Sequence, residues 1–95
     1  MRLRFVWDEV KSRSNLRKHG LSFETGMLVF DDPFHVTRQD RVVDGEARWQ
    51  AIGMVEGSVI LFVAHTVEDE VDELIRIISV RKATAGERRV YEEQA

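Results

Sequence analysis

The side chains of this 95-residue sequence that are best suited to binding or catalysis are cationic and aromatic. The set comprises Lys18, His19, Arg48, Trp49, Arg76, Arg81, Lys82, Arg88, Arg89 and Tyr91. A guanidinium group holds a phosphate through two parallel hydrogen bonds, and an aromatic ring stacks on an unpaired base. The set therefore has the composition of a binding site for RNA.

RNA cleavage without a metal requires residues of these kinds, because the 2′-hydroxyl of RNA is itself the attacking group. The protein must orient that hydroxyl, stabilise the added negative charge on phosphorus and protonate the leaving oxygen. We assign charge stabilisation to Arg81 together with Arg76 or Arg48. Because an unperturbed histidine titrates near neutral pH, His65 is a candidate general acid or base, although a single histidine in an apolar strand is more often a core residue.

Several of these cations also have a structural interpretation. Arg76 could form an ion pair with a carboxylate such as Asp8 or Glu24, and Arg88 and Arg89 could lie on a solvated helix face.

Arg76 and Arg81 are five positions apart on one predicted strand, so strict alternation places them on opposite faces of a sheet. They share a face only if the strand bends or bulges near Ser79. Arg81, with Lys82, is therefore the stronger candidate for an RNA-facing cluster.

Other chemistries find little support in the sequence. There is no cysteine, and the three histidines are far apart with no HxH or HExxH pattern. The acidic segment 68–73 lacks the glycine and the ligand spacing of a calcium loop, and is better explained as a solvated hairpin tip. No P-loop, nucleophile elbow or dinucleotide fingerprint occurs. We therefore predict neither a metal nor a cofactor.

Composition predicts an ordinary globular protein, with one domain over residues 1–95. Apolar residues make up 43% and charged residues 33% of the sequence. The net charge is −3, which argues against nonspecific binding driven by bulk charge. No apolar run is long enough to span a membrane and no signal peptide is evident, so a cytoplasmic location is expected.

The predicted elements begin with a short strand over 3–7. A helix over 9–19 follows, with Asp8 as its N-cap and Gly20 as its C-cap. Ser22 is expected to cap a second helix over 23–30.

Four strands and a last helix complete the prediction. The strands cover 36–41, 49–55, 59–66 and 74–80, and the helix extends to about residue 93. Thr84 and Glu87 have the spacing of a capping box at its start. Strands joined by short turns favour an antiparallel sheet. The expected fold is α+β, with two N-terminal helices and one C-terminal helix packed on an antiparallel sheet.

Four segments in this order resemble the BrnT family, the ribonuclease toxins of type II toxin–antitoxin pairs. They are Phe5–Glu9, Asn15–Glu24, Arg48–Gly53 and Arg76–Tyr91. The resemblance spans nearly the whole chain. Its pattern transfers to Lys18, His19, Arg48, Trp49, Arg76, Arg81 and Tyr91, without assigning each a catalytic step.

The resemblance implies a RelE-like fold, metal-independent cleavage of RNA and inhibition of translation and growth. The implied partner is a BrnA-type antitoxin, a DNA-binding protein of the ribbon-helix-helix class through which operator DNA would be bound. Two alternatives stay open. One is a noncatalytic module that associates with such a partner. The other, a DNA-binding protein, is weaker because no helix-turn-helix is evident.

Overall fold

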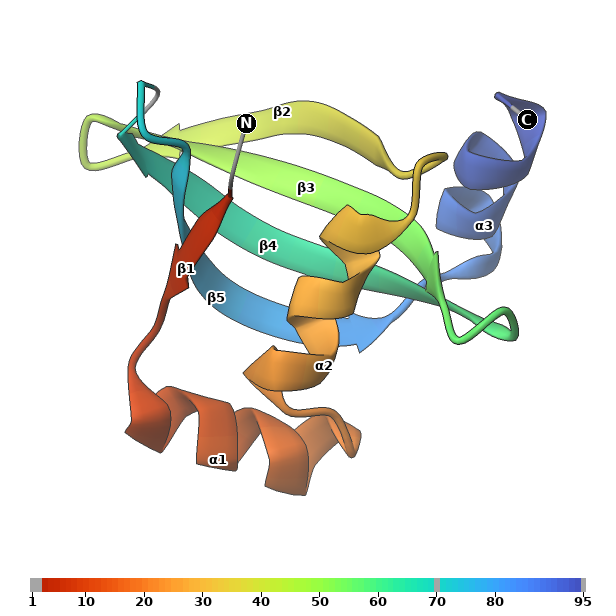
Figure 1. Ribbon diagram of the computed structural model, residues 1–95, viewed down its shortest axis with the longest axis horizontal. Helices are drawn as coiled ribbons and strands as arrows, with labels where there is room; N and C mark the ends of the chain where they lie inside the picture. The colour runs from red at the N-terminus through yellow and green to blue at the C-terminus, as the bar shows by residue number, and fades with distance from the viewer. Residues whose placement is uncertain (1–2, 70, 95) are drawn as a thin grey trace.

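The computed structural model describes residues 3–69 and 71–94, and its elements follow the predicted order (Figure 1). The strands are β1 (Arg4–Val6), β2 (Val36–Val43), β3 (Glu46–Val55), β4 (Val59–Asp69) and β5 (Leu74–Lys82). The helices are α1 (Glu9–His19), α2 (Phe23–Met27), a 3₁₀ turn (Leu28–Asp31) and α3 (Ala85–Glu93). In the described part of the chain, no helix has the length and apolar character needed to cross a membrane.

The five strands form one mixed sheet in the order β1-β5-β4-β3-β2. Strands β2 to β5 are antiparallel neighbours, as predicted, but β1 pairs with β5 in parallel. The expectation of a wholly antiparallel sheet was therefore wrong at this edge. The short-turn argument does not apply to β1, because helices and three strands separate it from β5 along the chain.

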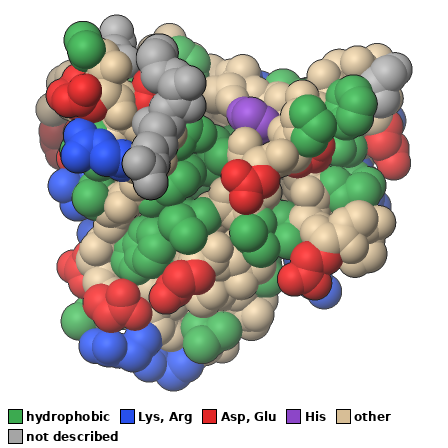
Figure 2. Space-filling model, viewed as in Figure 1, with side chains coloured by type: hydrophobic (Ala, Val, Ile, Leu, Met, Phe, Trp, Pro, Cys, Tyr) green, Lys and Arg blue, Asp and Glu red, His purple; other side chains and the backbone are tan. Residues whose placement is uncertain are grey.

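The main core lies between the sheet and helices α1 and α2, on what we call the α1/α2 face. It is built from alternate residues of the three central strands, such as Ala51, Leu61, Val63 and Ile77, packed with Phe23. Figure 2 shows this side of the molecule, where hydrophobic side chains fill the middle and Lys and Arg side chains lie over α1.

Helix α3 covers part of the opposite side of the sheet, the α3 face. A second core forms there from Ile52, Ile60, Phe62, Ala83 and Tyr91. Because neighbouring residues such as Ala51 and Ile52 belong to different cores, the sheet is buried on both sides at this end.

The predicted helix caps are confirmed. The Asp8 carboxylate accepts from two amides of the first turn of α1, and Gly20 ends that helix with φ of 74°. The Ser22 hydroxyl caps α2, and Thr84 and Glu87 form the predicted capping box of α3. The second helix is shorter than predicted, because after Met27 the chain continues as a 3₁₀ turn.

Strand β5 contains a bulge at Ile78. Ala64 of β4 pairs with Ser79, whereas the next residue, His65, pairs with Ile77. Ile78 therefore has no partner on β4, and the side-chain alternation of β5 changes phase at that residue.

Asn15 of α1 takes the place of a neighbouring strand along part of β5. Strand β1 pairs only with residues 74–76, so the later residues of β5 lack a strand on that side. The Asn15 side chain donates to the Val80 carbonyl at 2.8 Å and accepts from the Val80 amide at 3.2 Å. Its amide also donates to the carbonyl of Leu21 at 2.7 Å. This single side chain thereby connects α1, the following loop and the sheet.

Gly26 allows α2 to approach the sheet closely. A Cβ atom at this position would lie 2.5 Å from Cγ2 of Val80, whose side chain is fully buried. We expect Gly26→Ala to lower the free energy of unfolding by about 1–3 kcal/mol, because the overpacking outweighs the better helix propensity of alanine. Urea denaturation measures this change. Gly86→Ala, where the added Cβ meets no atom within 4 Å, is the matched control, and equal midpoints for the two variants would contradict the prediction.

Candidate RNA-binding site

Arg76 and Arg81 lie on the same face of the sheet because of the bulge in β5. Arg81 is opposite Phe62 on β4, and Arg76 is opposite Thr66. Phe62 and Thr66 are four residues apart on β4, which pairs regularly with β3 up to His65, so their side chains point to the same side. That side is the α3 face. The condition under which the two arginines could act together, a bulge near Ser79, is therefore met.

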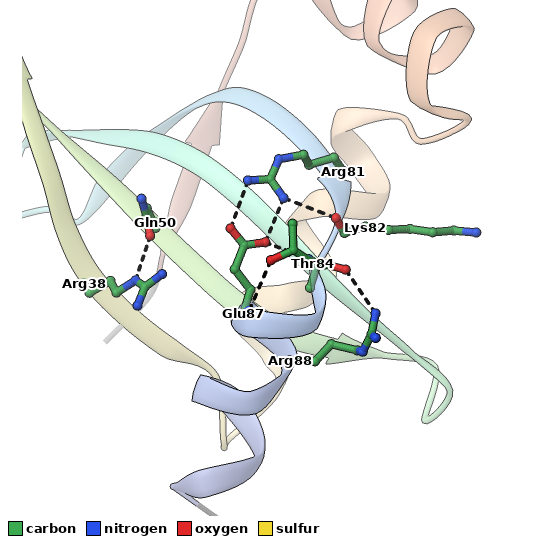
Figure 3. A network of polar contacts seen from close by, with 8 residues as sticks. Arg38, Gln50, Arg81, Lys82, Thr84, Glu87 and Arg88 are labelled. Atoms are coloured by element: carbon green, nitrogen blue, oxygen red, sulfur yellow. Dashed lines mark hydrogen bonds and ion pairs between the residues drawn. The ribbon is translucent and has the colours of Figure 1, made fainter.

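Two further arginines join them from β3 and β2. Arg48 is two residues before Gln50 on β3, and Arg38 pairs with Gln50 across the strands and donates from Nε to Gln50 Oε1 at 2.7 Å. Gln50 pairs in turn with Ala64, which faces the same side as Phe62. We call Arg38, Arg48, Arg76 and Arg81 the arginine face; Figure 3 shows Arg38, Gln50 and Arg81 on it beside the start of α3.

Arg38 was not among the residues chosen from the sequence. Residues 37–41 are all polar, so this strand shows no apolar alternation from which the face of Arg38 could be predicted. Only the cross-strand register shows that it faces the same side as Arg81.

Arg81 is held by three neighbours. Its Nη1 and Nη2 atoms donate to Oε1 and Oε2 of Glu87 at 2.7 and 3.0 Å, and Nη1 also donates to the Lys82 carbonyl at 3.3 Å. Its Cζ atom lies 3.9 Å from the centroid of the Phe62 ring. The Arg81 hydrogen bonds hold the pKa of Glu87 below its usual range, and the same bonds raise the pKa of Arg81.

Arg76 forms an ion pair with Glu68, not with Asp8 or Glu24 as the sequence suggested. Its Nε donates to Oε1 of Glu68 at 2.6 Å, and both side chains retain solvent exposure. This bond lowers the pKa of the Glu68 carboxyl. Because an exposed pair of this kind contributes little to stability, Arg76 can exchange this partner for another anion at small cost.

Arg48 and Arg38 take part in no ion pair among the described residues. The Nε atom of Arg48 is buried and forms no hydrogen bond with a described group. An unsatisfied buried donor is costly and rare in folded proteins. The arginine face therefore keeps positive charge that neighbouring described carboxylates do not pair.

His65 and Trp49 lie on the opposite face of the sheet from the arginines. They pair with each other across β3 and β4, and both line a cavity of about 430 Å³ on the α1/α2 face. His65 is 1% exposed, and its ring contacts Phe30 with centroids 5.1 Å apart. Burial, opposed in part by a hydrogen bond to the Val63 carbonyl, lowers the pKa of His65 to about 4.

The low pKa of His65 predicts a loss of stability in mild acid. In the unfolded chain a histidine has a pKa near 6.5, so between pH 6.5 and 4 the unfolded state takes up a proton that the native state does not. We expect the free energy of unfolding to fall by about 3 kcal/mol as the pH decreases through this window. Denaturant titrations at several pH values measure it. His65→Gln removes this component and His19→Gln, at an exposed position, retains it; identical pH profiles of wild type and His65→Gln would refute the assignment.

Tyr91 has a structural contact rather than an exposed ring. It is 7% exposed, and its hydroxyl donates to Oδ2 of Asp32 at 2.6 Å. This hydrogen bond raises the pKa of Tyr91 to about 12. Gln94 donates to the carbonyl of Phe34 beside it. Together these contacts fasten α3 to the loop after the 3₁₀ turn.

Lys82 and Arg88 are exposed at the junction of β5 and α3. Figure 3 shows the Lys82 side chain extending away from the Arg81–Glu87 pair. Arg88 donates from Nη1 to the carbonyl of Ala83 at 3.3 Å. Neither lies among the arginines of β2, β3 and the middle of β5.

Lys18 and His19 lie at the end of α1, next to the bulge. They line a cavity of about 230 Å³ together with Ile78 and Ser79. Ser79 pairs with Ala64 and thus faces the same side as the arginines. The basic end of α1 therefore meets the arginine face at the bulged edge of β5.

Across residues 3–69 and 71–94, no group of three or more His, Asp or Glu side chains is arranged to hold a metal ion. The guanidiniums of the arginine face are donors, and among the described residues only those of Arg76 and Arg81 have carboxylate partners, Glu68 and Glu87. Such a surface is suited to phosphate oxygens.

Two comparisons with known proteins identify the family of this chain. The family model described as the ribonuclease toxin BrnT of type II toxin–antitoxin systems matches residues 7–87. A 1.1 Å crystal structure of the Brucella abortus ribonuclease toxin BrnT is similar, with a TM-score of 0.63 and 26% identity, over 87% of this chain and 99% of that chain. A search of curated proteins gave no match. The chain belongs to the BrnT family of ribonuclease toxins of type II toxin–antitoxin systems.

Proposed function

We propose that this ribonuclease toxin cuts RNA internally on the arginine face, without a metal. The observation that carries the proposal is the bulge at Ile78, which brings Arg76 and Arg81 to one side of the sheet. Four arginines on one surface supply enough donors to bind the scissile phosphate and its neighbours.

The proposed reaction is an in-line displacement at phosphorus. The RNA 2′-oxygen forms a bond to phosphorus while the bond to the 5′-oxygen breaks, leaving a 2′,3′-cyclic phosphate on one product. The 2′-hydroxyl proton passes to water, and water protonates the leaving oxygen. Arg81, with Arg76 and Arg48, stabilises the additional negative charge of the phosphorane.

His65, Trp49 and Tyr91 are not part of the proposed contact surface. The first two face the other side of the sheet, and the Tyr91 ring is buried in the α3 core. Lys18 and His19 extend the surface instead, because they meet the arginine face at Ser79. The RNA strand would run from the sheet over the β5 edge toward α1.

The family implies a cognate antitoxin, and we propose that it is a ribbon-helix-helix protein through which operator DNA is bound. The net charge of −3 supports an indirect contact with DNA. A cytoplasmic location belongs to the same proposal.

One observation favours a noncatalytic module that binds the same partner: both Arg76 and Arg81 already have carboxylate partners.

Cleavage of a short single-stranded RNA by the purified chain, in the presence of EDTA, tests the proposed function. We expect Arg48→Ala and Arg76→Ala each to slow cleavage at least about tenfold. Arg4→Ala is the matched control, because Arg4 is an exposed arginine on β1 that contacts Asp72. RNA with 2′-deoxyribose at the cut site should stay intact. Wild-type rates for both variants, or cleavage of the deoxy substrate, would reject this site and mechanism.

A further inference from the structure

We propose that Arg81 binds one RNA phosphate through its Nε and Nη2 edge, and that Glu87 is the positioning residue that presents this edge. This inference rests on the proposed function, since it concerns the same surface. It adds a named subsite for a single phosphodiester and a residue of α3 that acts through Arg81.

The hydrogen bonds of Arg81 decide which edge is free. Both hydrogens of Nη1 have partners, Glu87 Oε1 and the Lys82 carbonyl, and one hydrogen of Nη2 is directed to Glu87 Oε2. The Nε hydrogen and the second Nη2 hydrogen have no partner among the described residues. These two hydrogens are parallel in a planar guanidinium, and they form the side fork that matches two oxygens of a phosphate.

Two contacts fix the orientation of that fork. The Phe62 ring supports the guanidinium from the sheet at 3.9 Å. Glu87 clamps the end of the group with both carboxylate oxygens (Figure 3). A guanidinium held at its end and on one side loses little further conformational freedom when it binds a phosphate. Binding therefore carries only a small entropic penalty for ordering the Arg81 side chain.

Glu87 is itself held too firmly to act as a removable competitor of RNA. Its Oε1 accepts from the Thr84 amide at 2.9 Å, its own amide donates to the Thr84 hydroxyl at 3.2 Å, and its side chain is 13% exposed. Its carboxylate neutralises part of the Arg81 charge. Arg38 and Arg48, with no ion pairs among the described residues, supply the positive charge that attracts the RNA backbone.

Glu87→Gln tests the inference, because glutamine keeps the size of the side chain and can still accept from the Thr84 amide. It can offer Arg81 only one acceptor, so the clamp is lost. We expect cleavage of the single-stranded RNA to slow about tenfold or more. Affinity for the uncleavable 2′-deoxy analogue, measured by fluorescence anisotropy, should fall as well. Glu92→Gln is the control, since it makes the same change at an exposed carboxylate of α3, and it should cleave at the wild-type rate.

A double-mutant cycle separates positioning from mere structural support. If Glu87 acts through Arg81, adding Glu87→Gln to Arg81→Ala should cause no further loss of cleavage. Additive losses would overturn the inference, and so would a Glu87→Gln variant that cleaves as fast as or faster than the wild type. The proposed function is tested separately, by the cleavage rates of Arg48→Ala and Arg76→Ala. Thermal melts of each variant confirm that it is folded at the assay temperature.

Discussion

Replacing Arg81 by alanine is expected to slow RNA cleavage by about 100- to 1,000-fold, the range observed when one donor to a developing charge is removed from an active site. Arg81 is the arginine of this surface whose guanidinium is held in place by both a carboxylate and an aromatic ring. Initial rates of cleavage of a short single-stranded RNA by the purified variant measure the effect.

Arg81→Lys is the informative companion to this variant. Lysine keeps the positive charge but lacks the planar fork, so its rate should lie much nearer to that of alanine than to that of arginine. If Arg81→Lys cleaves at the wild-type rate, charge alone is sufficient and the fork has no role. A cleavage rate of Arg81→Ala within a few-fold of wild type would remove Arg81 from the mechanism.

The largest effect on stability is expected for Asn15→Ala. This substitution removes three hydrogen bonds of 2.7, 2.8 and 3.2 Å and leaves the backbone groups of Val80 unsatisfied in the protein interior. Each unsatisfied buried group costs about 1–3 kcal/mol. We expect the free energy of unfolding to fall by about 3–5 kcal/mol, a large part of the stability of a small domain.

Urea denaturation monitored by circular dichroism gives this value. Ser14→Ala, at the adjacent exposed position of the same helix, should change stability by no more than about 0.5 kcal/mol and serves as the control. If the two variants unfold at the same urea concentration, Asn15 contributes nothing beyond an ordinary helix position.

Features determined by neighbouring residues could be predicted from the sequence. Asp8, Gly20 and Ser22, and the pair Thr84 and Glu87, form their caps within a few residues of the helix that each one starts or ends. The family resemblance was likewise visible in four short segments, and the family model confirms it. Asn15 gave no such signal, because its partner Val80 is 65 positions away.

The arrangement of the site depended on long-range pairing instead. Alternation predicts opposite faces for Arg76 and Arg81, and the bulge that reverses this is seen only in the pairing with β4. Nothing near His65 in the sequence indicates which face of β4 is covered by Phe30. The carboxylate partners of Arg76 and Arg81 were also unpredictable, since they depend on where the chain returns after each turn.

Because Ile78 is unpaired, the number of residues between Arg76 and Arg81 does not by itself decide whether they share a face. On a regular strand a spacing of four residues puts two side chains on one side, and a spacing of five does not. The bulge reverses this rule for the residues on either side of it. Two arginines can therefore share a face at a spacing of five residues with a bulge, or at a spacing of four residues without one. When sequences are aligned across this strand, a one-residue gap between the arginines can therefore preserve the site, whereas an ungapped alignment can disguise its loss.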